Sequence, residues 1–420
     1  MSLGLASATA RTFTSLRRHY NYRLYFFGQV VSLSGSWMQT VAQAWFVVQS
    51  THSPLAVGLL AVCQFGPYAL LGLFGGAVAD RYDQRRVLIF TQSAFMVTAS
   101  ALAALTLTGH ATVWEVYLIA VVTGCVTVLD TPVRQAFTIQ MVGRDELPNA
   151  IALNSSLFNA SRIVGPAIAG GLIALFGVGI CFLINALSFL AVIGALWLMR
   201  VDELFPISRD ATHQNLMRET LAGLKFAWRA PVIRTVLLML VVISTLGVNF
   251  NVLLPVLVSR TLDSGPQVFG ILSALFGFGA LAGALFSASL GRASRRALLV
   301  GAAGFSLAEV VLAPLRVTWA AALVLVVTGV AYSIYASQTN ATLQVSVTDQ
   351  MRGRILSIYG YAFFGLAPVG GLLAGWLAQA GGTQLAFLVA GLSGVVAAAY
   401  GWATAGRAAR ASAPPISQMA

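Results

Sequence analysis

The stretch "GGAVADRYDQRR", residues Gly75 to Arg86, gathers two Asp and three Arg into one short segment. Only 9% of the residues of the whole chain are charged. An apolar run of about 20 residues lies on each side of the stretch, and a helix of that length crosses roughly 30 Å of hydrocarbon. The pattern therefore predicts a charged loop between two membrane-spanning helices.

The composition of the whole chain supports this interpretation. Of its 420 residues 58% are hydrophobic, and the mean hydropathy is +0.82. A soluble domain is about half apolar and about a quarter charged, and it could not hide so much apolar surface. Apolar runs and the breaks between them predict an all-α membrane protein with twelve membrane-spanning helices. The predicted spans are 24–49, 54–79, 87–108, 112–131, 149–176, 179–199, 232–257, 267–290, 297–314, 318–338, 355–379 and 384–402.

The basic residues predict the orientation of these spans. The net charge is +12, and membrane proteins collect Lys and Arg on their cytoplasmic loops. With the N-terminus in the cytoplasm, only Arg260 and Arg316 fall on the outer side. We therefore expect a multi-pass protein of the inner (plasma) membrane with both termini cytoplasmic, and no nucleic-acid partner is needed to explain the charge. The cations expected inside are those of the linker and Arg11, Arg17, Arg18, Arg23, Arg81, Arg85, Arg86, Arg134, Arg144, Arg292, Arg295, Arg296, Arg352, Arg354, Arg407 and Arg410.

The residues that catalysis or metal binding would need are scattered. The three cysteines form no CxxC pair, the four histidines lie outside the predicted spans, and no P-loop pattern occurs. We therefore expect no catalytic site, no metal, no cofactor and no use of ATP, and the chain is not predicted to be an enzyme. These residues are Cys63, Cys125, Cys181, His19, His52, His110 and His213.

The two halves of the chain resemble each other. "SPLAVGLL" from Ser53 corresponds to "GPQVFGIL" from Gly265, and "RRVLIFTQSAF" from Arg85 corresponds to "RRALLVGAAGF" from Arg295. Pro166 and Pro368 occupy corresponding spans. A parallel duplication predicts two six-helix bundles with a substrate path between them. The predicted parts are a tail at 1–23, a bundle at 24–199, a linker with a surface helix at 200–231, a bundle at 232–402 and a tail at 403–420.

The order Gly76-x-x-x-Asp80-Arg81-x-x-x-Arg85-Arg86 resembles the signature loop of the major facilitator superfamily, and "GRASRR" from Gly291 is a weaker copy in the second half. The resemblance covers essentially the whole chain. More narrowly, "GQVVSLSGSWMQTVAQAWFV", "DTPVRQAFTIQMVGRDELPNAIALNSSLFNASRIVGPAIAGG" and "FLINALSFLAV" resemble the branch that contains the enterobactin exporter. This resemblance implies a transporter that works by alternating access.

In that superfamily the signature loop helps to latch the cytoplasmic side of the outward-open state. The resemblance therefore implies a latch of Gly76, Asp80 and the loop arginines. The arginines can bind the last carbonyls of other helices or a carboxylate of the fourth span, for which Asp130 at its end is the obvious partner. Asp83 and Gln84 stand where the family pattern has Gly and Arg, which leaves open which arginine reaches Asp130. The alternative is that Arg81, Arg85 and Arg86 only fix the topology.

Polar side chains inside apolar spans are the candidates for substrate contact, because each is costly in a bilayer. The alternative for most of them is hydrogen bonding between helices. A lone arginine in the fifth span either pairs with Asp130 or faces a cavity, where its guanidinium can bind a carboxylate, catecholate or phosphate. The candidates are Gln39, Gln43, Gln64, Tyr68, Arg162, Asn249, Tyr332 and Tyr335.

The function that these observations favour is secondary active transport. We expect an exporter of a small anionic or neutral molecule, such as a siderophore, drug or metabolite, in exchange for protons. Asp130 and Glu309 are the proton-coupling candidates, since few other carboxylates lie in or near the spans. A nutrient importer on the same fold is the alternative, and extrusion from loaded vesicles against uptake by cells would separate the two. We expect a monomer in a lipid bilayer.

Overall fold

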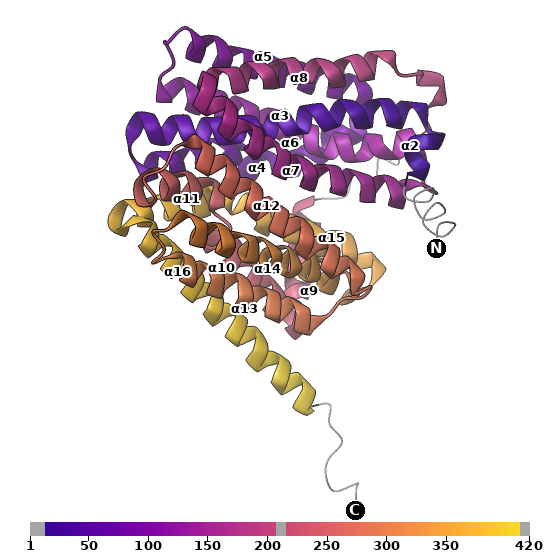
Figure 1. Cartoon of the computed structure of the whole chain (residues 1–420). Coiled ribbons are helices and arrows are strands. Elements are labelled where there is room, and N and C mark those ends of the chain that lie inside the picture. The colour runs from indigo at the N-terminus through magenta and orange to yellow at the C-terminus, as the bar shows by residue number, and fades with distance from the viewer. Residues whose placement is uncertain (1–12, 207–215, 412–420) are drawn as a thin grey trace, which may run out of the picture.

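The computed structural model describes residues 13–206 and 216–411, and within its helices it describes all side chains except those of residues 73–74, 76–80, 216–222, 349–350 and 405–411. The described part is helical throughout and contains no strand. The first bundle lies uppermost in Figure 1. It consists of α3 (Tyr20–Thr51), α4 (Pro54–Arg81), α5 (Gln84–Leu107), α6 (Val113–Val142), α7 (Leu147–Phe176) and α8 (Val178–Leu198), with the short α2 (Thr14–Arg18) before it.

The second bundle lies below the first in Figure 1. A linker with the 3₁₀ turn η1 (Val201–Glu203) leads to α9 (Leu216–Arg229), which packs on α10 and α15. Leu224 and Trp228 of α9 are exposed, in agreement with the surface helix expected there. The elements are α10 (Pro231–Leu246), α11 (Phe250–Val256), η2 (Leu257–Thr261), α12 (Pro266–Ser289), α13 (Arg295–Leu312), α14 (Thr318–Val345), α15 (Asp349–Gly360), η3 (Tyr361–Gly365) and α16 (Ala367–Ala411).

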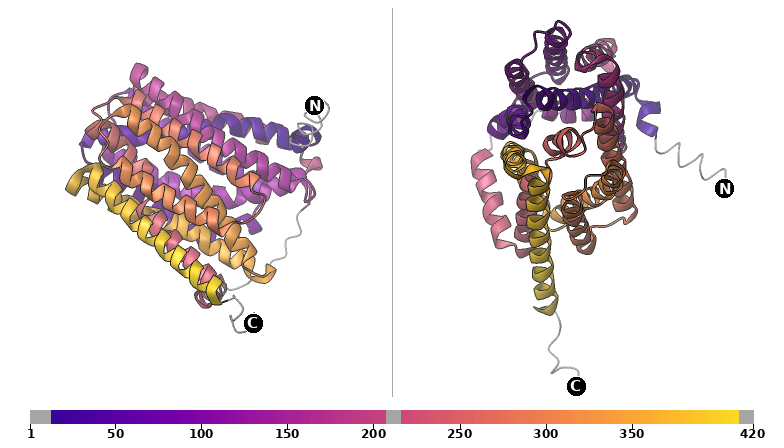
Figure 2. Two further views of the ribbon diagram at one scale, coloured as in Figure 1. Left: turned by 60° about the horizontal axis from the view of Figure 1, so that its bottom comes forward. Right: turned by 60° about the vertical axis from the view of Figure 1, so that its left-hand side comes forward.

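The two bundles meet along two pairs of helices, α7 with α12 and α4 with α16. The right-hand view of Figure 2 looks roughly along the helices and shows the two bundles side by side. Glycine allows the close approach at both crossings. A Cβ at Gly170 would lie 2.8 Å from the Pro266 carbonyl oxygen, and one at Gly58 would lie 2.6 Å from the Gly371 carbonyl oxygen. The two crossings occupy corresponding places in the two halves, which is consistent with the internal repeat.

The two ends of the bundle differ. We call the end at which α3 begins and α4 ends the basic end, and the end at which α3 ends and α4 begins the distal end. Contacts between the halves include Ser53 with Gln379 (3.2 Å) and the stacked rings of Trp45 and Phe269 (5.7 Å between centroids), all at or toward the distal end. The distal end is therefore closed in this conformation.

Three helices of the second bundle are interrupted. Residues 247–249 separate α10 from α11, and Asn249 has φ −113° and ψ 32°. The π-helical turns η2 and η3 lie close to Pro255 and Pro368, which cannot donate a backbone hydrogen bond. The range called α16 consists of two helices that meet at Gly381 and Gly382, where the backbone leaves helical geometry, and Gly382 has φ +72°, a conformation that glycine adopts without a Cβ penalty.

The outer surface explains the hydropathy. Large apolar side chains such as Leu70, Leu175 and Trp319 are more than 70% exposed, which suits contact with lipid. Nine helical stretches in the described ranges are long and apolar enough to cross a membrane. The count of twelve spans remains a prediction.

One predicted span is clearly too short. The apolar run of the fourth span stops at 131, but α6 continues to Val142. Asp130 and Arg134 are responsible, because they form an ion pair inside the helix, and a search for apolar runs stops at such a pair. Asp130 therefore lies about 18 Å from the basic end of α6 at 1.5 Å per residue. Arg134 is part of a helix and not of a cytoplasmic loop.

Candidate functional site

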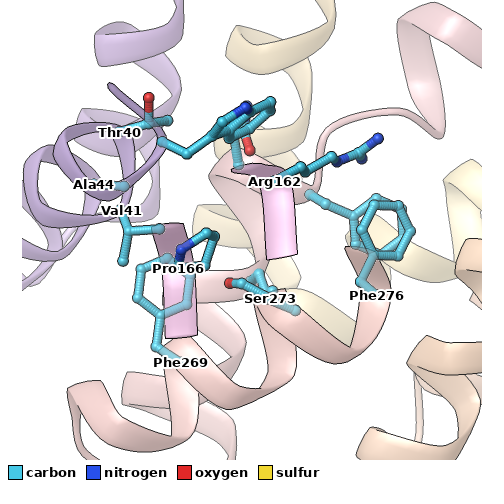
Figure 3. Close-up of a pocket in the computed structure, with 12 residues that line it drawn as sticks. Thr40, Val41, Ala44, Arg162, Pro166, Phe269, Ser273 and Phe276 are labelled. Carbon is cyan, nitrogen blue, oxygen red and sulfur yellow. The ribbon is translucent and has the colours of Figure 1, made fainter. Parts of the chain in front are cut away.

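A cavity of about 50 Å³ lies between the two bundles, at the level of Arg162. Trp37 and Thr40 of α3 and Arg162 and Pro166 of α7 line it from the first half. From the second half, the lining residues include Phe250 of α11 and Ser273 and Phe276 of α12 (Figure 3). Ligand pockets usually measure about 300–1,000 Å³. The cavity therefore holds at most a few waters, and the helices or side chains around it must move before a larger molecule can fit here.

Arg162 is the charged residue of this cavity. It lies midway along α7, and three aromatic rings surround its guanidinium carbon. The distances to the ring centroids are 4.9 Å for Phe276, 5.5 Å for Tyr332 and 5.8 Å for Trp37. Figure 3 shows the side chain reaching over Phe276. We call these three rings the aromatic cage of Arg162. Because the rings come from α3, α12 and α14, the cage joins the two halves.

The aromatic cage surrounds the Arg162 guanidinium, and no described carboxylate pairs with it. The ion pairs between described residues involve Arg18, His19, Arg134 and Arg200, and none of them includes Arg162. A lone arginine at the centre of a membrane helix costs roughly 2.5–3.5 kcal/mol. Cation–π contacts supply about 0.5–2 kcal/mol each, so three rings offset a cost of this size. The Tyr332 hydroxyl also has a side-chain hydrogen bond with Arg162. The guanidinium has five N–H donors, and those that remain can bind an anion in bidentate fashion.

Asp130 pairs with another residue than expected. Its Oδ2 accepts a hydrogen bond from Arg134 Nε at 3.0 Å, and the two side chains form an ion pair. Its Oδ1 accepts from Thr91 Oγ1 at 2.7 Å and from Gln92 Nε2 at 2.8 Å. Arg134 in turn donates to Gln29 Oε1 at 2.6 Å. The network joins α3, α5 and α6 within the first bundle, so in this conformation Asp130 pairs neither with the loop arginines nor with Arg162. The latch was expected for the outward-open state and stays a prediction.

The loop arginines have different surroundings. Arg85 Nε donates to the Leu196 carbonyl oxygen at 2.7 Å, near the C-terminal end of α8. Arg81 and Arg86 are exposed. Asp83, which departs from the family pattern, is the N-cap of α5 and accepts from the Arg86 backbone N–H at 2.9 Å. The surroundings of Gly76 and the side chain of Asp80 are not among those described, so the part of these residues in a latch stays a prediction.

The buried glutamines of the first bundle bond to neighbouring helices. Gln39 Oε1 accepts from Asn185 Nδ2 at 2.7 Å, which joins α3 to α8. Gln43 Oε1 accepts from Gln64 Nε2 at 3.0 Å, which joins α3 to α4. None of the three lines the cavity that holds Arg162. In this conformation they form the helix–helix hydrogen bonds that were the alternative to substrate contact.

The remaining candidates are dispersed. Asn249 donates to the Thr245 carbonyl oxygen at 2.7 Å, across the break between α10 and α11. Tyr68 packs against Phe364 of η3, with ring centroids 5.8 Å apart. Tyr335 is almost completely buried, and only Tyr332 joins Arg162 in the aromatic cage. Sequence alone therefore identified two members of this group, Arg162 and Tyr332.

Trp37 and Phe276 supply two of the three cage rings, and neither was predicted from the sequence as a site residue. Apolar and aromatic residues are so common in membrane helices that neither stands out from its neighbours. A signal was present for Trp37, which lies within the quoted stretch that resembles exporters. The position of Phe276 becomes informative only when α12 is placed beside α7.

Comparisons with known proteins agree with this architecture. A family model described as transmembrane secretion effector matches residues 10–416. The staphyloferrin A transporter of Staphylococcus aureus is 28% identical over 378 residues, which are 88% of this chain and 92% of that protein. The multidrug efflux pump Tap of Mycolicibacterium fortuitum is 28% identical over 377 residues, with the same coverage. The enterobactin exporter EntS of Shigella flexneri is 27% identical over 285 residues, or 68% of this chain and 67% of that protein.

Solved structures share the fold at lower identity. A bacterial homologue of the human lysosomal transporter Spinster, in an inward-facing and unoccupied conformation, superposes with a TM-score of 0.72. It is 14% identical and covers 92% of this chain and 96% of that chain. A peptide transporter in complex with sulfate gives a TM-score of 0.73 at 11% identity, covering 93% of this chain and 95% of that chain. At these identities the likeness concerns the fold alone.

Proposed function

The chain belongs to the transmembrane secretion effectors of the major facilitator superfamily, and from this premise we propose that it is an exporter of a small anionic molecule. Relatives over most of its length are named as a staphyloferrin A transporter, a multidrug efflux pump and an enterobactin exporter. We further propose that export is driven by proton exchange, from the inner (plasma) membrane, with both termini in the cytoplasm. The substrate class includes siderophores and other molecules with carboxylate, catecholate or phosphate groups.

One observation carries the choice of an anion. Arg162 lies in a cavity between the bundles, and three rings stabilise its charge without an acid. An exporter of cations would be expected to place a carboxylate there. The acids of the bundle helices whose side chains are described, Glu115, Asp130 and Glu309, do not line this cavity. The cage therefore favours a ligand with a negative group.

The position of the cage also supports alternating access. Its residues come from both halves, so a ligand held by Arg162 touches both bundles at once. The glycine crossings hold the distal end closed above the cavity. When the halves rock, the crossings separate and the cavity opens toward the distal end, which by the distribution of basic residues is the outer side.

Transport into everted membrane vesicles tests this function. Staphyloferrin A and enterobactin, the molecules named for two relatives, are the first probes, and the cation ethidium is the comparison. We expect vesicles that contain the protein to accumulate an anionic probe above vesicles from cells with an empty vector. A protonophore should abolish the accumulation.

Two results would contradict the proposal. Accumulation of the anionic probe by intact cells, with none in everted vesicles, would indicate an importer. Accumulation that persists undiminished after the proton gradient has been collapsed would contradict proton exchange.

A further inference from the structure

Glu309 is a carboxyl group in the interior of the second bundle. It lies on α13, and its residue has no exposed surface. Among the described residues, neither of its carboxyl oxygens has a hydrogen-bond partner. A carboxylate in such a place would lack both solvent and a counter-ion, which costs several kcal/mol or more. This packing can therefore hold only the neutral acid.

The carboxyl group lies against the break between α10 and α11. A Cβ at Gly247, the first residue of the break, would lie 3.1 Å from Glu309 Oε2. The space for the carboxyl group thus exists because residue 247 has no side chain. Thr245, just before the break, also has a buried hydroxyl oxygen without a partner. A movement of the break would change the surroundings of Glu309 directly.

A chain of rings connects Glu309 with the anion site. Phe305, one turn before Glu309 on α13, lies 5.7 Å from the Tyr332 ring and 6.1 Å from the Phe250 ring. Phe250 is the first residue of α11 after the break, and it stacks on Phe276 at 4.6 Å. Tyr332 and Phe276 are two of the three cage rings of Arg162. The ring contacts thus run from the cage to Phe305, which lies beside Gly247 as Glu309 does.

Among the described side chains, none forms an ion pair or a hydrogen bond with this carboxyl group. α13 packs against α14 and α16, and α10 brings Gly247 to it. The arginines at the basic ends of α10 and α13 are roughly 20 Å away along their helices at 1.5 Å per residue. Arg316 is exposed beyond the end of α13, and Arg260 donates to the His52 carbonyl oxygen. The titratable groups of the surrounding elements are Tyr332, Tyr335, Tyr400, Arg234, Arg260, Arg295, Arg296, Arg316, Arg407 and Arg410.

We propose that Glu309 carries the exchanged proton, binding it while the distal end is open, holding it as the distal end closes, and releasing it toward the cytoplasm when the break between α10 and α11 rearranges. The inference rests on the proposed proton-driven export. In the release step the carboxyl O–H bond breaks, the proton goes to water, and a carboxylate remains. Return to the closed-distal packing requires one proton to be bound again. Asp130 does not fit this role, since Arg134, Thr91 and Gln92 already saturate its oxygens.

The test measures conformation against pH and needs no substrate. Trp114 is the second residue of α6 and Trp319 the second residue of α14, so both lie at the distal end, one in each half, and both are exposed. Each is replaced by a spin-labelled cysteine, in a chain whose three native cysteines are replaced by alanine. The distance between the labels is then measured in lipid nanodiscs at about pH 6 and about pH 9, a range that spans the titration of documented buried Glu side chains.

We expect the distance in the parent protein to lengthen by several ångströms as the pH rises, because loss of the proton disfavours the closed-distal state. Glu309→Gln, which mimics the neutral acid, should keep the short distance at both values. Glu203→Gln, at an exposed pair with Arg200, should respond as the parent does. If Glu309→Gln does not fold, Glu309→Met, an apolar side chain of similar length, gives the same test.

A parent distance that does not change with pH, or a Glu309 variant that responds like the parent, would overturn the proposal. The export assay distinguishes this failure from that of the function. Parent vesicles that transport the probe without a proton gradient would contradict proton-driven export, whatever the distances show. Proton-dependent transport that survives in Glu309→Gln would contradict only the role of Glu309.

Discussion

Arg134 and Arg162 are both arginines within apolar helices, yet the protein stabilises their charges in different ways. Arg134 has a carboxylate four residues earlier on the same helix, and this pair is visible in the sequence. Arg162 has rings from three other helices, which no spacing along the chain reveals. The sequence could therefore predict that Arg162 is exceptional, but it could not predict what surrounds it.

Removing one partner of the Asp130–Arg134 pair should destabilise the first bundle. Asp130→Asn leaves Arg134 without its acid in a largely buried site, and breaking such a pair costs on the order of 3 kcal/mol. The double variant Asp130→Asn, Arg134→Gln should regain part of this loss. Thermal unfolding of the purified proteins in detergent measures the difference.

The control is Glu203→Gln, which breaks an exposed pair worth at most about 1 kcal/mol. If Asp130→Asn unfolds at the parent temperature, the network is not structural. Asp130 would then have to be reconsidered as a group that changes partners during transport.

At the scale of the helices, the glycine crossings decide how closely the halves approach. Gly170 and Gly171 are neighbours on α7, but only Gly170 faces α12. A Cβ on Gly170 would lie 2.9 Å from the Gly270 Cα, whereas one on Gly171 would have no atom within 4 Å. This pair separates the effect of the contact from the effect of replacing a helical glycine.

Gly170→Ala should shift the protein toward the state that is open at the distal end. The added methyl meets backbone atoms, which cannot move aside as a flexible side chain would, so α7 and α12 must separate. Ser273→Cys, in a chain whose native cysteines are replaced by alanine, reports the opening through its reaction with an impermeant maleimide added to intact cells. We expect labelling several-fold faster with Gly170→Ala and unchanged with Gly171→Ala. Equal rates in the two variants would mean that this crossing does not control access.

Most helices were predictable from hydropathy, while their interruptions were not. The predicted boundary at 54 and that at 176 agree with α4 and α7, because Pro and Gly end the apolar runs there. The break at 247–249 lies within a continuous apolar run, so the composition of that run did not predict a break. The extension of α6 beyond 131 was missed because a charged pair neutralised within a helix resembles the end of a span.

At the scale of the whole molecule, the distribution of charge and the internal repeat lead to one topology. The two halves meet through corresponding crossings, and most basic residues lie at one end. Reporter fusions after residues 52, 110 and 317 should read outside, and those after 83, 210 and 294 should read inside. An inverted result at any corresponding pair would show that a span has been miscounted.

In the proposed transport cycle, Arg162 is the residue that binds an anion between the two halves. The direct measurement is the affinity for an exported anion, together with its rate of export, in Arg162→Gln, Arg162→Lys and the exposed control Arg316→Gln. Both Arg162 variants should fold and bind the anion at least about tenfold more weakly, which corresponds to about 1.4 kcal/mol. Lys should not restore binding, because it lacks the planar fork that offers two parallel N–H donors. The control should match the parent, and export of the anion by Arg162→Gln at the parent rate would contradict the account.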